Sequence, residues 1–382
     1  MVFILTALTY RDAGVDIDLE EEASKIMYEA SKKTWENRKG KLGEVFIPFE
    51  HFSGLRGIRV GGLPSDSIMS KSFDGVGTKV EIAERNCKHD TVAYDLLAML
   101  CDDSVRYNSE PVLVGSILDV NKLWKGEGGD KTIYLNFIQQ LADGMVASAK
   151  EAGVAIINGE IAELGYRIRG YGDFNYNWAG GVVSFLRESK ALTGFEIKPH
   201  DGLVSLKEEG FRSNGISLVR KTLEKVYGEK WHEEEFGGQN LGELALHPSR
   251  IYSKTIVDMT GGFEGEPKVE IHGIAHITGG GMPGKLGRIL KPNNLGAYID
   301  DAFEPCELML HCQEIGNISD EESYRSWNMG QGMTVVTPEP EGVIKIANNH
   351  NIEAKLIGEV KKEPGIRIVS KGYYKTNKVI SF

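Results

Sequence analysis

The stretch Asp74-Gly75-Val76-Gly77-Thr78-Lys79 follows a strand-like run over residues 67–73 and predicts a ligand site at a strand end. Asp74 offers hard oxygen atoms of the kind that bind Mg²⁺. The two glycines let the backbone approach a ligand closely, while Thr78 and Lys79 can contact phosphate oxygens. This set of groups is typical of a nucleoside triphosphate site, although the Walker A spacing is absent. Taken alone, the stretch is equally consistent with a tight Asp-Gly turn in a hairpin.

Composition and charge narrow the class of protein. A chain of 382 residues is expected to form about two domains. The hydrophobic fraction of 41% is sufficient for a sizeable core. The net charge of −11 argues against a nucleic-acid partner, because phosphate backbones are bound by clustered Lys and Arg. A small anionic substrate remains compatible with this charge, since a phosphate site can be local.

The cysteines and the apolar segments predict a cytoplasmic protein with no membrane partner. The four cysteines are scattered and form no Cys-x-x-Cys pair, which disfavours a zinc site or a disulfide framework. The apolar N-terminal run over residues 1–8 is too short for a signal sequence. No window approaches the apolar length of a membrane span.

Apolar periodicity predicts a mixed arrangement of helices and strands in two domains, 1–190 and 191–382. Gly194, Pro199 and Gly202 interrupt the pattern near the predicted boundary. The expected helices cover residues 19–37, 91–101, 131–152 and 217–227. The expected strands cover residues 67–73, 111–118, 154–157, 179–185, 202–206, 271–277, 355–360 and 366–369. Residues 250–258 fit either a helix start or a long strand.

Acids and amides beside glycine or small residues recur at the ends of these elements. They occur at Asp16/Asp18, Asp74-Gly75, Asp102-Asp103, Asn158-Gly159-Glu160 and Ser213-Asn214-Gly215. Each segment alone is a weak signal, because an Asn-Gly pair is usually a turn. Adjacent acids repel each other and are better tolerated when they share a cation.

The order of these segments resembles the AIR synthetase (phosphoribosylformylglycinamidine cyclo-ligase) family over most of the chain. Residues 74–79 match the family's ATP motif, and Ser213-Asn214-Gly215-Ile216-Ser217-Leu218-Val219-Arg220 is similar to its Ser-Asn-Gly-Tyr-Ser-Leu-Val-Arg. The other similar segments, in order, are residues 10–18, 158–163, 248–252, 273–281 and 328–330. Seven motifs in the same order make the resemblance specific.

The resemblance implies an α+β, two-domain AIR-synthetase-like fold. In this fold the N-terminal sheet forms a dimer barrel shared with a second subunit, and the C-terminal domain is an α/β sandwich. It also implies an ATP-dependent cyclo-ligase of purine biosynthesis, a cytoplasmic homodimer that converts formylglycinamidine ribonucleotide to aminoimidazole ribonucleotide. ATP would phosphorylate the formyl-amide oxygen and turn it into a good leaving group.

The resemblance also assigns roles to individual residues. Metal ligands for Mg²⁺–ATP would be Asp74, Asp103 and Glu160. Asp16, Asp18, Gly75, Gly77, Thr78 and Lys79 would complete the ATP site. Asp103, Asn214 and Arg212 would act on the nucleotide substrate, beside the glycine loop 279–281. The sequence leaves open whether K⁺ is also needed.

The chain departs from the family pattern at several positions. Asn108 and Ser109 stand where the family has Gly-Ala, and Asp102 stands where it usually has Asn. Arg212 replaces a common His: it can substitute for a phosphate contact but not for a proton-transfer group. Whether Asp102 or Asp103 faces the metal stays open at this point.

Two alternative functions stay open, and the departures motivate the second of them. One is another ATP-using member of the same superfamily, such as a selenophosphate synthetase, a thiamine-phosphate kinase or a hydrogenase-maturation enzyme. Selenophosphate synthetase would need a reactive cysteine in the N-terminal loop, whereas the first cysteine here is Cys87. The other alternative is a catalytically silent nucleotide-binding homologue.

Overall fold

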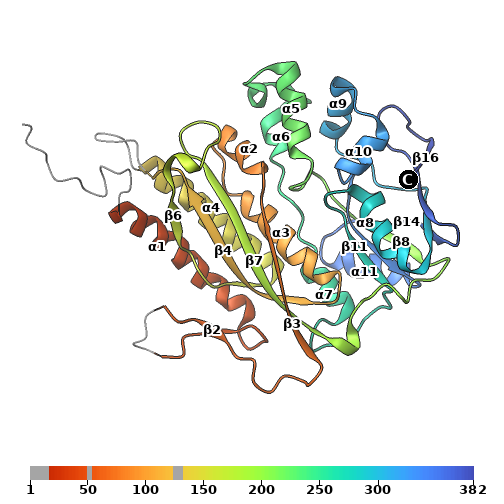
Figure 1. The fold of residues 1–382 in the computed structure, drawn as a ribbon, viewed down its shortest axis with the longest axis horizontal. Coiled ribbons are helices and arrows are strands. Elements are labelled where there is room, and N and C mark those ends of the chain that lie inside the picture. Colours follow the sequence, from red (N-terminus) through yellow and green to blue (C-terminus); the bar gives the residue numbers. More distant parts are fainter. Residues whose placement is uncertain (1–16, 50–53, 124–131) are drawn as a thin grey trace, which may run out of the picture.

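The computed structural model describes residues 17–49, 54–123 and 132–382. Within this part of the chain, two mixed sheets lie side by side, each with its own helices (Figure 1). The predicted boundary after residue 190 falls between the last strand of one sheet and the first strand of the other. The boundary itself stays a prediction. The apolar run over residues 1–8 and the motif residue Asp16 lie outside the described residues.

The N-terminal sheet has the strand order β3-β7-β4-β5, with β6 paired to β4. β7 runs antiparallel to both β3 and β4, whereas β5 and β6 run parallel to β4. The strands are β3 (Ser67–Gly75), β4 (Glu110–Val120), β5 (Ala155–Ile156), β6 (Ile161–Glu163) and β7 (Tyr176–Arg187). A small hairpin of β1 (Val45–Phe46) and β2 (Gly57–Ile58) precedes them.

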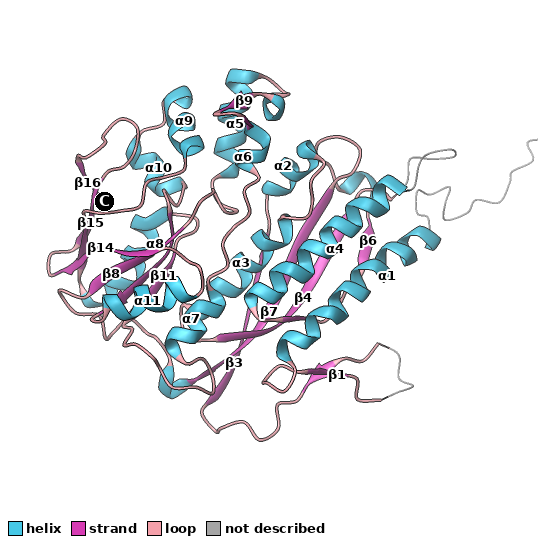
Figure 2. Ribbon diagram, turned by 180° about the vertical axis from the view of Figure 1, so that it is seen from behind, coloured by secondary structure: helices cyan, strands magenta, loops and turns pink. Residues whose placement is uncertain are grey.

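Three helices cover one face of this sheet, as Figure 2 shows. They are α1 (Ile17–Thr34), α3 (Val92–Val105) and α4 (Thr132–Ala152). One face of α4, with Ile138, Leu141 and Met145, is buried, and Gly153, with φ of +73°, ends the helix in a left-handed conformation. α3 is buried nearly all round because it lies between the sheet, α4 and the C-terminal half. The last turns of α3 therefore place Asp102 and Asp103 at the junction of the two halves.

The C-terminal sheet has the strand order β11-β13-β8-β14-β12-β15-β16. Every residue of the central strand β13 is buried, including the polar residues Gln331, Thr334 and Thr337. The strands are β8 (Gly202–Lys207), β11 (Gly273–His276), β12 (Gly296–Ile299), β13 (Gln331–Thr337), β14 (Ala354–Lys361), β15 (Gly365–Val369) and β16 (Val379–Ser381). A short hairpin joins β9 (Glu235–Phe236) and β10 (Gln239–Asn240).

Helices flank the C-terminal sheet, which agrees with the α+β expectation. α7 and α11 pack together beside β8 and β14, while α8 packs on β11 and β15. The helices are α5 (Ile216–Tyr227), α6 (Leu241–Ala245), α7 (Ser253–Thr260), α8 (Gly281–Leu290), α9 (Glu307–Gly316), α10 (Asp320–Ser326) and α11 (Pro340–Asn349). The ambiguous segment 250–258 is thus mainly helical. No helix among the described residues is both long and apolar enough to cross a membrane.

Candidate functional site

The quoted stretch forms the predicted strand-to-helix turn. Asp74 is the penultimate residue of β3, and α2 (Lys79–Asn86) begins directly after Thr78. The backbone N–H of Gly75 donates to Asp74 Oδ1 over 2.7 Å, which fixes the carboxylate at the turn. Gly77 has φ of +69°, a conformation that favours glycine. The alternative of a simple hairpin turn is excluded, because a helix and not a strand follows.

Asp103 presents its carboxylate to the same junction from the end of α3. Its Oδ1 lies 3.4 Å from His276 Nδ1, and its Oδ2 accepts from Arg106 Nη2 over 3.0 Å. Partial burial opposes ionisation, but the hydrogen bond from His276 and the charge of Arg106 outweigh it and lower the pKa of Asp103. Asp103 is therefore an anchored, ionised carboxylate at neutral pH.

The charges of Asp74 and Lys285 also act on the carboxylate of Asp103. Partial burial raises the pKa of Asp74, and the negative charge of Asp103 contributes to that increase. Lys285 on α8 interacts electrostatically with both acids. Repulsion between Asp74 and Asp103 is relieved when they share a cation. Two carboxylates fit Mg²⁺, which typically takes one or two carboxylates together with phosphate oxygens and waters.

Three helix N-termini meet beside these acids. Thr78 Oγ1, just before α2, lies 3.3 Å from Ser217 Oγ in the first turn of α5. A Cβ atom on Gly279, two residues before α8, would lie 3.7 Å from the amide nitrogen of Asn214, two residues before α5. Helix N-termini carry free N–H groups and partial positive charge, so their convergence suits phosphate groups.

Two polar atoms at this place lack partners. Asn214 Oδ1 and Ser213 Oγ are buried and accept or donate no hydrogen bond within the described part of the chain. Buried polar groups are nearly always hydrogen-bonded, so this unpaired pair is available to a ligand. The region bordered by Asp74, Asp103 and the three helix N-termini is called the cleft below. The predicted residue Asn214 therefore lies where a ligand is expected.

Lys79, in contrast, does not face this cleft. Its side chain is completely buried, and Nζ lies 2.7 Å from Asp95 Oδ1 and also donates to the backbone carbonyl of His247. The prediction that Lys79 contacts phosphate is wrong for this structure, because its ammonium is enclosed between the two halves. It is a buried structural ion pair.

Arg212 is also buried, which contradicts its predicted direct role on the substrate. Its guanidinium pairs with Asp102 Oδ2 over 2.9 Å and with Glu208 Oε2 over 2.8 Å. The same guanidinium lies 3.0 Å from His276 Nε2. Of the two adjacent acids, Asp102 is fully buried against Arg212, whereas the side chain of Asp103 is 30% exposed and so is accessible to a ligand.

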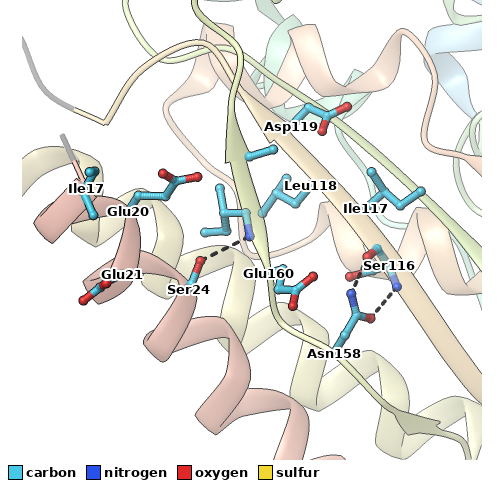
Figure 3. A pocket seen from close by; sticks show the side chains of 12 residues that line it. Ile17, Glu20, Glu21, Ser24, Ser116, Ile117, Leu118, Asp119, Asn158 and Glu160 are labelled. Atoms are coloured by element: carbon cyan, nitrogen blue, oxygen red, sulfur yellow. Dashed lines mark hydrogen bonds between the residues drawn. The ribbon is translucent and has the colours of Figure 1, made fainter. Parts of the chain in front are cut away.

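A second pocket, of about 550 Å³, lies at the other edge of the N-terminal sheet (Figure 3). It is lined by α1, the end of β4 and the segment that contains Asn158 and Glu160. Asn158 bonds to both the N–H and the carbonyl of Ser116, at 2.8 and 2.7 Å, which fixes the segment to β4. Glu20 and Asp119 add further negative charge to this pocket.

The structure does not bring Glu160 to Asp74 and Asp103. Asp74 of β3 is paired with Gly180 of β7, and Gly180 is paired with Ser116 of β4. The whole width of β7 therefore separates Asp74 from the pocket that contains Glu160. Among the residues that the structure describes, no three acids, histidines or cysteines could together hold a metal ion. The predicted three-carboxylate metal set is thus not assembled within this chain. Asp18 lies exposed in the first turn of α1.

Comparison with known families matches both halves of the chain. Residues 60–183 match the N-terminal domain of AIR synthase related proteins, and residues 198–371 match the C-terminal domain. The phosphoribosylformylglycinamidine cyclo-ligase of Thermococcus kodakarensis is 33% identical over 367 residues, covering 96% of this chain and 99% of the relative. That of Acetivibrio thermocellus is 36% identical, covering 92% and 96%. This chain belongs to the AIR synthetase family.

Solved structures agree with this family at the level of the fold. A thiamine-monophosphate kinase from Stenotrophomonas maltophilia K279a has a TM-score of 0.60 at 12% identity, covering 91% of this chain and 96% of that one. The hydrogenase maturation protein HypE in complex with ATP has a TM-score of 0.55 at 13% identity, covering 85% and 87%. The much higher identity to cyclo-ligases favours the AIR synthetase family over the alternative members of the superfamily.

Sequence reasoning missed three residues of these AIR synthetase sites. Lys285 follows the glycine loop by one helical turn, and that spacing is the signal that could have identified it. Asp119 directly follows the apolar run 111–118 and so obeys the rule of an acid at a strand end. His276 lies on β11, and no local signal in the sequence reveals its bond to Asp103.

Proposed function

We propose that this protein catalyses the ATP-dependent cyclisation of formylglycinamidine ribonucleotide to aminoimidazole ribonucleotide, with release of ADP and phosphate, in purine biosynthesis. The observation that carries the proposal is the identity of 33–36% over nearly the full length of relatives named for this reaction. The cleft supports it independently, because it combines acids for a cation with helix N-termini for phosphates.

The chain's own residues suit the two steps of this reaction. The formyl-amide oxygen attacks the γ-phosphorus of ATP and ADP leaves; a substrate nitrogen then attacks the activated carbon, loses its proton, and phosphate departs. Asp74 and Asp103 would hold Mg²⁺, which when bound neutralises charge on the phosphates. Lys285 and the N-termini of α2, α5 and α8 would stabilise negative charge on the transferred group. Asn214 would orient the substrate through its unpaired oxygen.

The direct test mixes the purified protein with Mg²⁺–ATP and formylglycinamidine ribonucleotide. Phosphate and aminoimidazole should appear in equal amounts, and both should require substrate and Mg²⁺. Repeating the assay with and without K⁺ decides whether a monovalent cation is needed. ATP binding with neither product would contradict the proposal and would favour the silent homologue.

We further infer a cytoplasmic homodimer that uses the uncovered face of the N-terminal sheet. Large apolar side chains stand on this face: Phe73 is 74% exposed, Met69 is 55% exposed and Ile117 is 60% exposed. An apolar sheet face of this kind usually marks an interface between proteins. Ile117 also lines the pocket that contains Glu160, so a partner on this face would border that pocket.

Sedimentation velocity tests the dimer. The wild type should sediment as a dimer at micromolar concentration. Phe73→Glu should sediment as a monomer, because burying an unpaired carboxylate in the interface is unfavourable. Phe195→Glu is the matched control, since Phe195 is 71% exposed but lies after the N-terminal sheet in the chain. A monomeric wild type, or equal effects of both variants, would contradict the inferred interface.

A further inference from the structure

A chain of buried hydrogen bonds leads from the junction of the two halves to the carboxylate in the cleft. It begins at Arg212, whose guanidinium bridges Asp102 and Glu208 with all three side chains at most 1% exposed. These two bonds fix the plane and position of the guanidinium. Arg212 also has a left-handed backbone, with φ of +57°. A non-glycine residue keeps such a backbone only when its surroundings strongly determine it.

The next bond fixes which nitrogen of His276 carries the hydrogen. Arg212 Nη2 lies 3.0 Å from His276 Nε2. A guanidinium can only donate, so Nε2 must be the accepting nitrogen. The neutral imidazole then carries its hydrogen on Nδ1. With the opposite tautomer, two N–H groups would face each other in a fully buried place, and each would lack an acceptor.

The last bond in the series joins His276 to Asp103. His276 Nδ1 lies 3.4 Å from Asp103 Oδ1, so its N–H points at the carboxylate. Arg106 Nη2 donates to the other oxygen, Oδ2, over 3.0 Å. Each oxygen of Asp103 thus accepts one bond from the protein and keeps a lone pair for a ligand. The carboxylate is held in one orientation from both sides.

We propose that His276 is a positioning residue for Asp103, and that Arg212 sets the tautomer that makes this possible. The proposal deepens the proposed function, because it rests on Asp103 as a ligand of the nucleotide-bound cation. The proposal makes one chemical requirement at each nitrogen of the imidazole. A donor is needed at the Nδ1 position to hold Asp103, and an acceptor is needed at the Nε2 position to satisfy Arg212.

The tautomer can be measured on the protein without any ligand. Long-range ¹H–¹⁵N correlation spectra of histidine-labelled protein at pH 7.5 should show His276 with a protonated Nδ1 and a bare Nε2. His276→Gln identifies the signal by its disappearance. A protonated Nε2, or an imidazolium, would overturn the proposal whether or not the protein is a cyclo-ligase.

Two isopolar variants separate the two ends of the imidazole. His276→Asn places an amide near the Nδ1 position and retains a donor for Asp103. His276→Gln places its amide near the Nε2 position and retains an acceptor for Arg212. We expect the Gln variant to bind Mn²⁺ and a non-hydrolysable ATP analogue about tenfold more weakly, and the Asn variant to stay within about twofold of wild type.

The controls distinguish this role from a general loss of stability. His272→Asn makes the same substitution at another buried histidine, which bonds to Asp201 instead of a cleft residue. It should leave Mn²⁺–nucleotide affinity unchanged while lowering the melting temperature. In the Gln variant at position 276, KM for ATP should rise more than kcat falls. Equal losses in both variants at position 276, or no loss in the Gln variant, would overturn the proposal. A wild type that binds no nucleotide would instead contradict the proposed function.

Discussion

The cleft between the two halves and the pocket beside α1 both contain acids, but they differ in how completely one chain builds them. In the cleft, Asp103 is hydrogen-bonded on both oxygens, and groups from both halves face it. In the pocket, Glu160 lies among residues of a single half, next to the sheet face on which Phe73 and Ile117 are exposed. The cleft is therefore preorganised within the chain, and this lowers the cost of binding a ligand. The pocket borders a face that suits a partner.

The strongest test of this contrast is Asp103→Asn. The amide removes the charge that would hold the cation, so kcat/KM for cyclisation should fall by about a thousandfold. Melting behaviour should stay close to wild type. Asp301→Asn, at an exposed acid that pairs with Lys355, serves as the control and should retain activity. Activity of Asp103→Asn within tenfold of wild type would remove Asp103 from the site.

Lys79→Met tests whether the cleft depends on buried support behind it. Removing the ammonium leaves Asp95 buried without its cation, so the free energy of unfolding should fall by about 3 kcal/mol. The double variant Lys79→Met/Asp95→Leu should recover most of that loss, since it removes both buried charges. Denaturant unfolding measures both variants. A stable Lys79→Met with greatly reduced affinity for ATP would instead restore the phosphate role predicted from the sequence.

Glu160→Gln tests the pocket. If the pocket contributes only to nucleotide binding, KM for ATP should rise about tenfold while kcat and melting temperature change little. Glu29→Gln is a suitable control, because Glu29 is an acid on α1 that lies outside the pocket and pairs with Lys32. A loss of kcat comparable to that of Asp103→Asn would erase the distinction between the two regions.

An effect of pH on stability is expected from Glu84, near the C-terminal end of α2. Burial raises the pKa of Glu84 to about 7 from its ordinary 4.5, although the backbone N–H groups of Tyr171 and Tyr176 oppose this. The folded state therefore binds the proton more tightly than the unfolded state. The contribution of Glu84 to stability is largest below about pH 4.5 and is lost as pH rises towards about 7, by at most about 3 kcal/mol.

Glu84→Gln should remove this pH dependence. Nearby His89, whose pKa burial lowers to about 4, contributes the opposite slope below its ordinary 6.5. The relevant measurement is thus the difference in unfolding free energy between wild type and variant from pH 4.5 to 7.5. Relative to the variant, the wild type should lose stability as pH rises. A difference that is independent of pH would show that Glu84 titrates normally.

Local sequence predicted the helices and strands and the acids at their ends. It did not predict which groups the side chains of Lys79 and Arg212 contact. Asp74 and Asp103 lie near the ends of elements, and Asn214 lies just before one, and the apolar pattern of these elements can be recognised in the sequence. Lys79 and Arg212 were assigned to ligands, whereas their partners are buried acids far along the chain. Asp95 is 16 residues from Lys79, and Asp102 is 110 residues from Arg212. The packing of α2 against α3 determines the first pair, and the packing of the two halves determines the second. The separation of Glu160 from Asp74 similarly depends on strand order, which no motif encodes.

The strand order of the C-terminal sheet has a consequence for how the chain folds. β8 is the first strand of that sheet in the sequence, yet its two neighbours are β13 and β14. Contacts between segments so distant in sequence form slowly, because a long loop must close before any pairing is gained. Ser205 of β8, for example, donates a hydrogen bond to Met333 of β13, which lies 128 residues further along the chain. β8 therefore has no strand to pair with in this sheet until β13 has been synthesised. The strands of the N-terminal sheet end at Arg187, so that sheet can pair before β13 and β14 have been synthesised.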